Sequence, residues 1–126
     1  MGWEVHPKSL ERLLVRLDRE YGSPALIITE NGASYPTEPD DTGRIQDVER
    51  RSYLHSHLLA VCDAIDEGAK VEGYFAWSLM DNFEWAFGYA QRFGLVWVDY
   101  ETLERTPKDS ALWYRDVAKA RCVPED

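Results

Sequence analysis

The chain has 126 residues, of which 44% are hydrophobic and 29% are charged. This length and composition are typical of one soluble globular domain and exclude a disordered chain. Fourteen Lys and Arg residues against 23 Asp and Glu residues give a net charge of −9. Because that charge repels nucleic-acid phosphates and anionic lipids, neither nucleic acid nor a membrane surface is expected as a partner.

The sequence shows no pattern typical of a targeting segment, a membrane span or a metal-binding motif. No apolar run approaches the roughly 20 residues needed to span a bilayer, and residues 1–13 are too polar for a signal peptide, so a cytoplasmic location is expected. Cys62 and Cys122 are typical of free thiols in a reducing compartment. The three His residues lack the spacing of a zinc site. No metal and no cofactor are expected.

The first quarter of the chain predicts a helix and then a strand. Pro7 suits the first turn of the helix, and Gly22 and Pro24 end it. The apolar residues between them share one face at helical spacing: Leu10, Leu13, Leu14, Leu17 and Tyr21. Residues 25–29 are continuously apolar, which is the pattern of a strand buried on both faces of a parallel sheet. The Asn-Gly pair at 31–32 predicts a turn that closes this strand.

The middle of the chain predicts a second helix and a second strand. Residues 33–45 are rich in Pro, Asp, Thr and Gly and indicate a surface loop. A helix is expected over about 46–67, ending near Gly68. Its predicted buried face consists of Leu54, Leu58, Val61 and Ile65. Residues 71–78 are largely apolar and predict a second parallel strand.

The last third predicts an extended segment over 93–100 and a final helix. Residues 106–109 match a helix start, with Thr at the cap, Pro at the first position and an acid at the third. We expect that helix to expose Lys108 and Arg115. The side chains that it should bury are Trp113, Tyr114 and Val117. The whole order is α/β alternation in one domain, in which active sites lie at the C-terminal ends of the strands.

Two stretches beyond strand ends carry groups suited to chemistry. Glu30 ends the first strand, where a charge is costly unless it is paired or faces a polar pocket. Taken alone, a glutamate at this position is more often a solvated loop residue. Residues 77–85, W-S-L-M-D-N-F-E-W, combine two acids, an amide and three aromatic rings. Because acids and amides bond sugar hydroxyls and indole rings stack on sugar rings, these residues favour a sugar-binding loop. The alternative is a structural loop that is capped by its polar residues and anchored by its hydrophobic ones.

Together these stretches resemble glycoside hydrolase family 1, the β-glucosidase family. The pattern I-T-E-N-G at 28–32 is followed by W-S-L-M-D-N-F-E-W-A-F-G-Y at 77–89, and residues 1–7, 92–100 and 105–111 resemble further family segments in the right order. The resemblance covers nearly the whole chain. It implies the C-terminal part of a (β/α)8 TIM barrel, about the last two strands with their helices, and not a complete barrel.

The resemblance also implies a role for each matching residue. Glu30 matches the nucleophile, which attacks the anomeric carbon and forms a covalent glycosyl-enzyme, with Asn31 beside it. Trp77 matches a residue that stacks in the glycone pocket or where that pocket joins the aglycone site. Glu84 and Trp85 match the pair that bonds sugar hydroxyls. Phe93 matches an aromatic residue that lines the same pocket. Three further residues match the motif but are expected to hold the loop in its conformation: Ser78, Asp81 and Asn82.

The second carboxyl group of a retaining glycosidase is missing from the sequence. That group lies about 5–5.5 Å from the nucleophile, and in this family it belongs to an Asn-Glu-Pro motif that the chain lacks. The similar T-E-P at 37–39 follows the nucleophile strand, so Glu38 is rejected as the acid. A whole barrel takes about 250 residues, so two strands should leave open edges.

The leading hypothesis is that the parent protein hydrolyses β-glycosides with retention and that this chain supplies the nucleophile and part of the glycone pocket. The expected ligand is a β-glycoside or glucose-like sugar, and Glu84 favours neutral sugars because an acid repels a 6-phosphate. The alternative is an inactive truncated barrel that acts as a sugar-binding or self-assembling module, as a homo-oligomer. A third hypothesis is that a missing N-terminal barrel segment completes the site from another chain.

Overall fold

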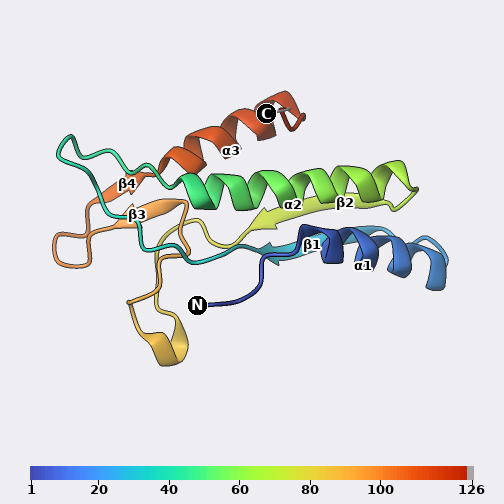
Figure 1. Cartoon of the computed structure of the whole chain (residues 1–126), viewed down its shortest axis with the longest axis horizontal. Coiled ribbons are helices and arrows are strands. Elements are labelled where there is room, and N and C mark those ends of the chain that lie inside the picture. The colour runs from blue at the N-terminus through green and yellow to red at the C-terminus, as the bar shows by residue number, and fades with distance from the viewer. Residues whose placement is uncertain (125–126) are drawn as a thin grey trace.

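The computed structural model describes residues 1–124. The elements in chain order are α1 (Pro7–Glu20), β1 (Leu26–Asn31), α2 (Val48–Asp66), β2 (Val71–Ala76), the 3-10 helix η1 (Trp85–Phe87), β3 (Val96–Val98), β4 (Arg105–Pro107) and α3 (Asp109–Ala120). Figure 1 shows the long helix α2 lying between α1 and α3. The predicted alternation of helices and strands is confirmed, and α2 agrees with its predicted range to within two residues.

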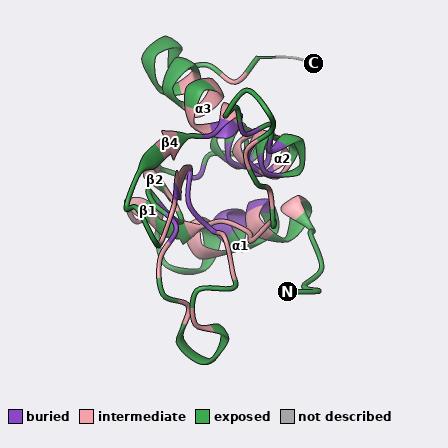
Figure 2. Ribbon diagram, turned by 90° about the vertical axis from the view of Figure 1, so that its left-hand side faces the viewer, coloured by how far each residue is buried: buried purple, intermediate pink, exposed green. Residues whose placement is uncertain are grey.

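Helices α1 and α2 pack over one face of the parallel pair β1–β2. Figure 2 shows the buried residues gathered on the inner sides of these helices. The core consists of Leu14 and Val15 from α1, Val61 and Ala64 from α2, and Ala69, with Leu26, Ile28, Val71 and Tyr74 packed against it. This hydrophobic cluster fixes the sheet against the helices.

The opposite face of the sheet is uncovered. Ile27 of β1 is 56% exposed and Phe75 of β2 is 60% exposed, because side chains alternate between the two faces of a strand. The prediction that residues 25–29 are buried on both faces is therefore wrong for this chain. The run is apolar on both sides, but helices cover only one side of the two strands.

The predicted Asn-Gly turn is also wrong. Asn31 is the last residue of β1, where it pairs with Ala76, and its carbonyl accepts a hydrogen bond of 2.9 Å from the Trp77 N–H. Gly32 lies so close to the next chain segment that a Cβ there would overlap the carbonyl oxygen of Trp77. The glycine is needed for the close approach of the two strand ends rather than for a turn.

The start of the last helix differs from the prediction. Residues 105–107 form β4, in which Thr106 pairs with Trp97 of β3, and the helix begins only at Asp109. Lys108 is fully buried rather than exposed. Its ammonium nitrogen lies 2.9 Å from the carboxylate of Asp81, which is buried too. The need to neutralise that acid overrides the usual preference of a lysine for solvent.

Some helix faces are rotated from their predicted positions. Leu13 of α1 is 51% exposed whereas Val15 is buried, and Ile65 of α2 is 45% exposed. Three side chains of α3 are half-buried rather than buried: Trp113, Tyr114 and Val117. Only a narrow face of each helix contacts the rest of this chain, so side chains at the edge of its apolar stripe stay accessible to solvent. None of the helices in residues 1–124 is long and apolar enough to cross a membrane.

Candidate active site

A hollow of about 330 Å³ lies at the C-terminal ends of β1 and β2. It is lined by Trp3, Glu30, Asn31, Gly32, Tyr53, Trp77, Glu84 and Phe93. Five of the six predicted site residues therefore meet in one place, although they come from segments far apart in the chain. The exception is Trp85. A hollow of this size falls in the range of small-molecule sites.

Glu30 enters the hollow from the end of β1. It lies between Ile28 and Asn31, where the pairing of β1 with β2 is irregular. An irregularity of this kind re-aims the side chains within it. Glu30 is exposed and lines the hollow, so its carboxylate is accessible to a ligand there.

Asn31 is held by two tyrosines, one from β2 and one from α2. Its Oδ1 accepts a hydrogen bond of 2.7 Å from the hydroxyl of Tyr74 on β2, and the hydroxyl of Tyr53 on α2 also bonds the Asn31 side chain. Burial raises the pKa of Tyr74. Burial also raises the pKa of Tyr53, although the bond to Asn31 acts in the opposite direction. Both phenols thus remain protonated at neutral pH, and Tyr74 is the donor to Asn31. Asn31 holds the strand end in place whether or not it also contacts a sugar.

Tyr53 and Trp3 line the hollow but were not predicted as site residues. Tyr53 lies in the first turns of α2, next to Leu54 of the predicted buried face. A tyrosine beside a buried stripe, near the carboxyl end of a parallel strand, is a signal that could have indicated it. Trp3 precedes the first element and is 71% exposed; no pattern in the sequence distinguishes it.

The segment after β2 is folded by its own polar side chains. The Oγ of buried Ser78 donates to the Met80 carbonyl at 2.8 Å, and Asn82 donates to Ser78 Oγ at 2.9 Å. The Ser78 N–H donates to the carbonyl of Phe93 at 3.1 Å. This last bond places the buried ring of Phe93 beside Trp77, which forms the adjacent wall of the hollow.

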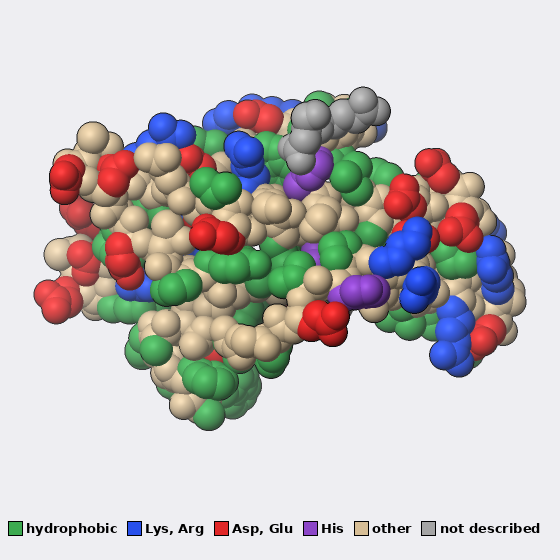
Figure 3. Space-filling model, viewed as in Figure 1, with side chains coloured by type: hydrophobic (Ala, Val, Ile, Leu, Met, Phe, Trp, Pro, Cys, Tyr) green, Lys and Arg blue, Asp and Glu red, His purple; other side chains and the backbone are tan. Residues whose placement is uncertain are grey.

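The side chains of Glu84 and Trp85 point to different places, although the two residues are adjacent in the chain. Glu84 lines the hollow and begins a tight loop, in which its N–H donates to the carbonyl of Gly88 at 2.7 Å. Trp85 is 83% exposed, outside the hollow, with a positive φ of 40°. The loop projects from the body of the chain in Figure 1, and Figure 3 shows hydrophobic side chains gathered at that end. They are Phe83, Trp85, Phe87 and Tyr89.

Buried charges support the wall that contains Phe93. Asp81 accepts hydrogen bonds from the Gly94 N–H at 2.8 Å, from Lys108 at 2.9 Å and from Arg92 at 3.2 Å. Burial lowers the pKa of Lys108 to about 8, and the nearby Arg50 adds to this, while Asp81 opposes it. The three interactions satisfy a carboxylate that would otherwise be costly to bury.

Glu38 lies away from the hollow. Its carboxylate accepts a hydrogen bond of 3.1 Å from the indole N–H of Trp97 and lies 3.9 Å from the guanidinium of Arg92. The Glu38 side chain is 62% exposed and does not line the hollow. The acid of the Thr-Glu-Pro sequence is thus engaged at another surface.

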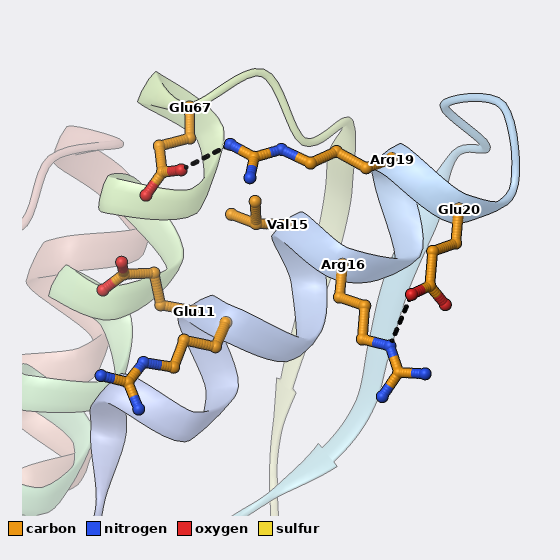
Figure 4. Close-up of a pocket in the computed structure, with 7 residues that line it drawn as sticks. Glu11, Val15, Arg16, Arg19, Glu20 and Glu67 are labelled. Atoms are coloured by element: carbon orange, nitrogen blue, oxygen red, sulfur yellow. Dashed lines mark hydrogen bonds and ion pairs between the residues drawn. The ribbon is translucent and has the colours of Figure 1, made fainter.

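A second hollow, of about 360 Å³, lies beside α1 and the C-terminal end of α2. Figure 4 shows its charged side chains in pairs, with Arg19 against Glu67 and Arg16 against Glu20, both at 3.0 Å. None of the predicted site residues lines it. Within residues 1–124, no group of three His, Cys, Asp or Glu side chains converges as a metal site.

Comparison with known proteins defines the family. The family model of glycosyl hydrolase family 1 matches residues 1–122, and the chain belongs to this family. Beta-glucosidase A of Acetivibrio thermocellus is 48% identical over 119 residues, which are 94% of this chain and 27% of that protein. The bifunctional beta-D-glucosidase/beta-D-fucosidase of Bifidobacterium breve is 53% identical over 119 residues, covering 91% of this chain and 26% of that protein. The chain thus spans about a quarter of the length of these relatives.

Solved structures define the fold. The family 1 β-glucosidase from Thermotoga maritima in complex with isofagomine lactam superposes with a TM-score of 0.96 at 45% identity, over 98% of this chain and 28% of that one. The same enzyme has been solved with glucoimidazole and with deoxynojirimycin, at the same TM-score. The predicted fold class is confirmed: the chain is the C-terminal part of a (β/α)8 barrel, about its last two strands with their helices.

Proposed function

We propose that this chain supplies the nucleophile and one wall of the glycone pocket of a retaining β-glycosidase. The observation that supports this most directly is that Glu30 lines the same hollow as Trp77, Glu84 and Phe93. In this proposal the Glu30 carboxylate attacks the anomeric carbon, the bond to the leaving oxygen breaks, and a glycosyl ester forms that water later hydrolyses. The two aromatic rings face the sugar ring, and Glu84 accepts hydrogen bonds from its hydroxyls.

The whole protein is proposed to hydrolyse β-glycosides with retention. Family membership and the β-glucosidase names of the relatives support this. The general acid that protonates the leaving oxygen is proposed to lie outside this chain, since the sequence has no Asn-Glu-Pro and Glu38 lies away from the hollow. A sugar contact by Trp85 requires the 84–88 loop to turn the indole toward the hollow.

The decisive test separates attack by the nucleophile from help by the acid. Dinitrophenolate leaves without being protonated, so 2,4-dinitrophenyl β-glucoside needs only the nucleophile for the first step. We expect one hexosyl group on the peptide that contains Glu30, detected by mass spectrometry, and no cleavage of cellobiose. Glu30→Gln should not be labelled, whereas Glu38→Gln, altered at an exposed acid outside the hollow, should be labelled like the parent. Equal labelling of Glu30→Gln, or rapid cleavage of cellobiose, would refute the proposal.

A second candidate function is that of a sugar-binding or self-assembling module. The exposed Ile27 and Phe75 on the open sheet favour it, because apolar side chains beside unpaired strand edges promote association. Light scattering combined with calorimetric titration of glucose or cellobiose distinguishes it: a uniform oligomer that binds sugar without turnover supports the module. Co-expression with an N-terminal barrel segment of the family tests whether another chain supplies the acid, and Glu30→Gln should then abolish activity.

A further inference from the structure

Arg50 lies in the first turn of α2, outside the hollow, yet its guanidinium contacts two segments that border the hollow. The side chain is buried, with 2% of its surface exposed. One terminal nitrogen donates to the carbonyls of Ala33 at 2.6 Å and Phe93 at 3.0 Å. The other donates to the carbonyls of Arg92 at 2.7 Å and Tyr35 at 3.3 Å.

The four carbonyls belong to two segments that are far apart in the chain and that both border the hollow. Residues 33–35 follow Gly32 directly, at the end of the strand that carries Glu30. Residues 92–93 include Phe93, which lines the hollow. The two segments lie side by side, since the Tyr35 N–H donates to the Arg92 carbonyl at 3.3 Å. One side chain therefore bonds both of these segments at once.

The guanidinium itself is fixed in orientation. Its Nε donates to the carboxylate of Asp47 at 2.8 Å, and Asp47 is fully buried. The same carboxylate accepts from the backbone N–H of Ser110 at 2.8 Å and from the Ser110 hydroxyl. All five N–H groups of Arg50 thus have an acceptor, which is the full capacity of this side chain. An ion pair with Asp47 alone would use one of the five.

We propose that Arg50 is a positioning residue of the sugar site, which sets the separation between the Glu30 end of β1 and the wall formed by Phe93. The proposal rests on the proposed function for its consequence in sugar binding. The guanidinium is planar and rigid, so its four carbonyl bonds fix a distance that a flexible ammonium cannot fix. Lysine at this position would keep the charge opposite Asp47 but would offer three donors in place of five.

The test compares Arg50→Lys with Leu54→Ala. Leu54 lies one turn further along the same helix and is 2% exposed, so its truncation loosens the packing of α2 without removing any of these carbonyl bonds. Both variants are studied at a temperature where circular dichroism shows them folded. Two quantities are measured: hydrogen exchange of the Tyr35 and Arg92 amides, and calorimetric affinity for deoxynojirimycin.

Arg50→Lys should speed exchange of both amides and weaken deoxynojirimycin binding, each by about tenfold or more, because small displacements at a site are costly. Leu54→Ala should leave both quantities within about threefold of the parent, although it also lowers the melting temperature. Equal losses in the two variants, or unchanged exchange in Arg50→Lys, would overturn the proposal. Failure of the parent chain to bind deoxynojirimycin contradicts the proposed function instead, and the exchange arm still decides the role of Arg50.

Exchange in the unaltered chain decides the question if Arg50→Lys does not fold. The proposal requires the Tyr35 and Arg92 amides to exchange together with those of α2, because one side chain joins them to that helix. Exchange of these amides at rates typical of an exposed loop would overturn it.

Discussion

The ammonium nitrogen of Lys108 lies 2.9 Å from Oδ1 of Asp81, and neither side chain is accessible to solvent. The same carboxylate oxygen accepts a hydrogen bond from the N–H of Gly94, the residue after Phe93. The ion pair therefore joins the residue just before α3 to the wall of the hollow. We expect a change in the protonation of Lys108 to alter both the stability of the fold and this wall.

Stability should rise between about pH 8 and pH 10. The pKa of Lys108 is lowered to about 8 in the folded chain, so over this range the unfolded chain binds more protons than the folded one, and raising the pH favours folding. The full effect is about 3 kcal/mol. Urea unfolding at pH 7.5, 9 and 10 measures it.

The matched control for this pH effect is Lys108→Met, in which the rise should disappear even if the chain is less stable throughout. Above about pH 10 the tyrosines act in the opposite sense, because the raised pKa of buried Tyr74 makes its stabilising contribution fall as the pH increases. A parent chain whose stability declines steadily from pH 7.5 would contradict the prediction.

Tyr74→Phe should weaken the contact between the C-terminal ends of β1 and β2. The change removes the hydroxyl that donates to Asn31 at 2.7 Å and keeps the ring. We expect a loss of about 1–2 kcal/mol in the free energy of unfolding, measured by urea titration. Tyr21→Phe, at a residue that is 70% exposed, is the control and should cost almost nothing. Equal effects at the two positions would mean that the bond to Asn31 contributes no stability.

Gly32→Ala should disturb the hollow more than the fold. The added methyl group would overlap the Trp77 carbonyl oxygen, so the two strand ends must move apart. Deoxynojirimycin affinity should fall about tenfold or more, and the tryptophan fluorescence of the chain should change. In Gly73→Ala, by contrast, the new Cβ meets the Ile27 side chain at 3.3 Å. That variant should keep its affinity, and an equal loss there would refute the prediction.

Phe93→Ala and Trp85→Ala should differ in both stability and binding. Phe93 is 5% exposed and lines the hollow, so its truncation should cost about 3–5 kcal/mol and weaken deoxynojirimycin binding. Trp85 is 83% exposed and outside the hollow; its removal should change stability by less than about 0.5 kcal/mol and leave binding by the isolated chain unchanged. Weaker binding in Trp85→Ala would show that the 84–88 loop turns toward the sugar in solution.

The sequence predicts the elements of this fold well, because hydrophobic periodicity and the Pro and Gly positions are local signals. Five of the six candidate site residues line one hollow, since the carboxyl ends of parallel strands share an edge. The burial of Lys108 could not be predicted, because it depends on Asp81, 27 residues away along the chain. The role of Arg50 could not be predicted for another reason: its acceptors are backbone carbonyls, which no residue type in the sequence indicates.

The exclusion of Trp85 from the hollow has a different cause. Its neighbour Glu84 enters the hollow while the indole points elsewhere, with a positive φ of 40° at Trp85. Adjacent residues in a motif are easily assumed to act together, yet here the tight turn that begins at Glu84 directs the two side chains to different places. The pattern of residue types predicts which groups are near a site but not the direction of each side chain.

The exposed Ile27 and Phe75 have a consequence for handling the protein. Apolar rings and branched chains next to unpaired strand edges are a template for aggregation, and molecular chaperones recognise such surfaces in the cell. Expression of the isolated chain should therefore depend on temperature and concentration more than its high negative charge suggests. Ile27→Lys would place a charge on that face and so oppose the association of one chain with another. Ile27 does not line the hollow, so the substitution should leave the proposed sugar site unchanged.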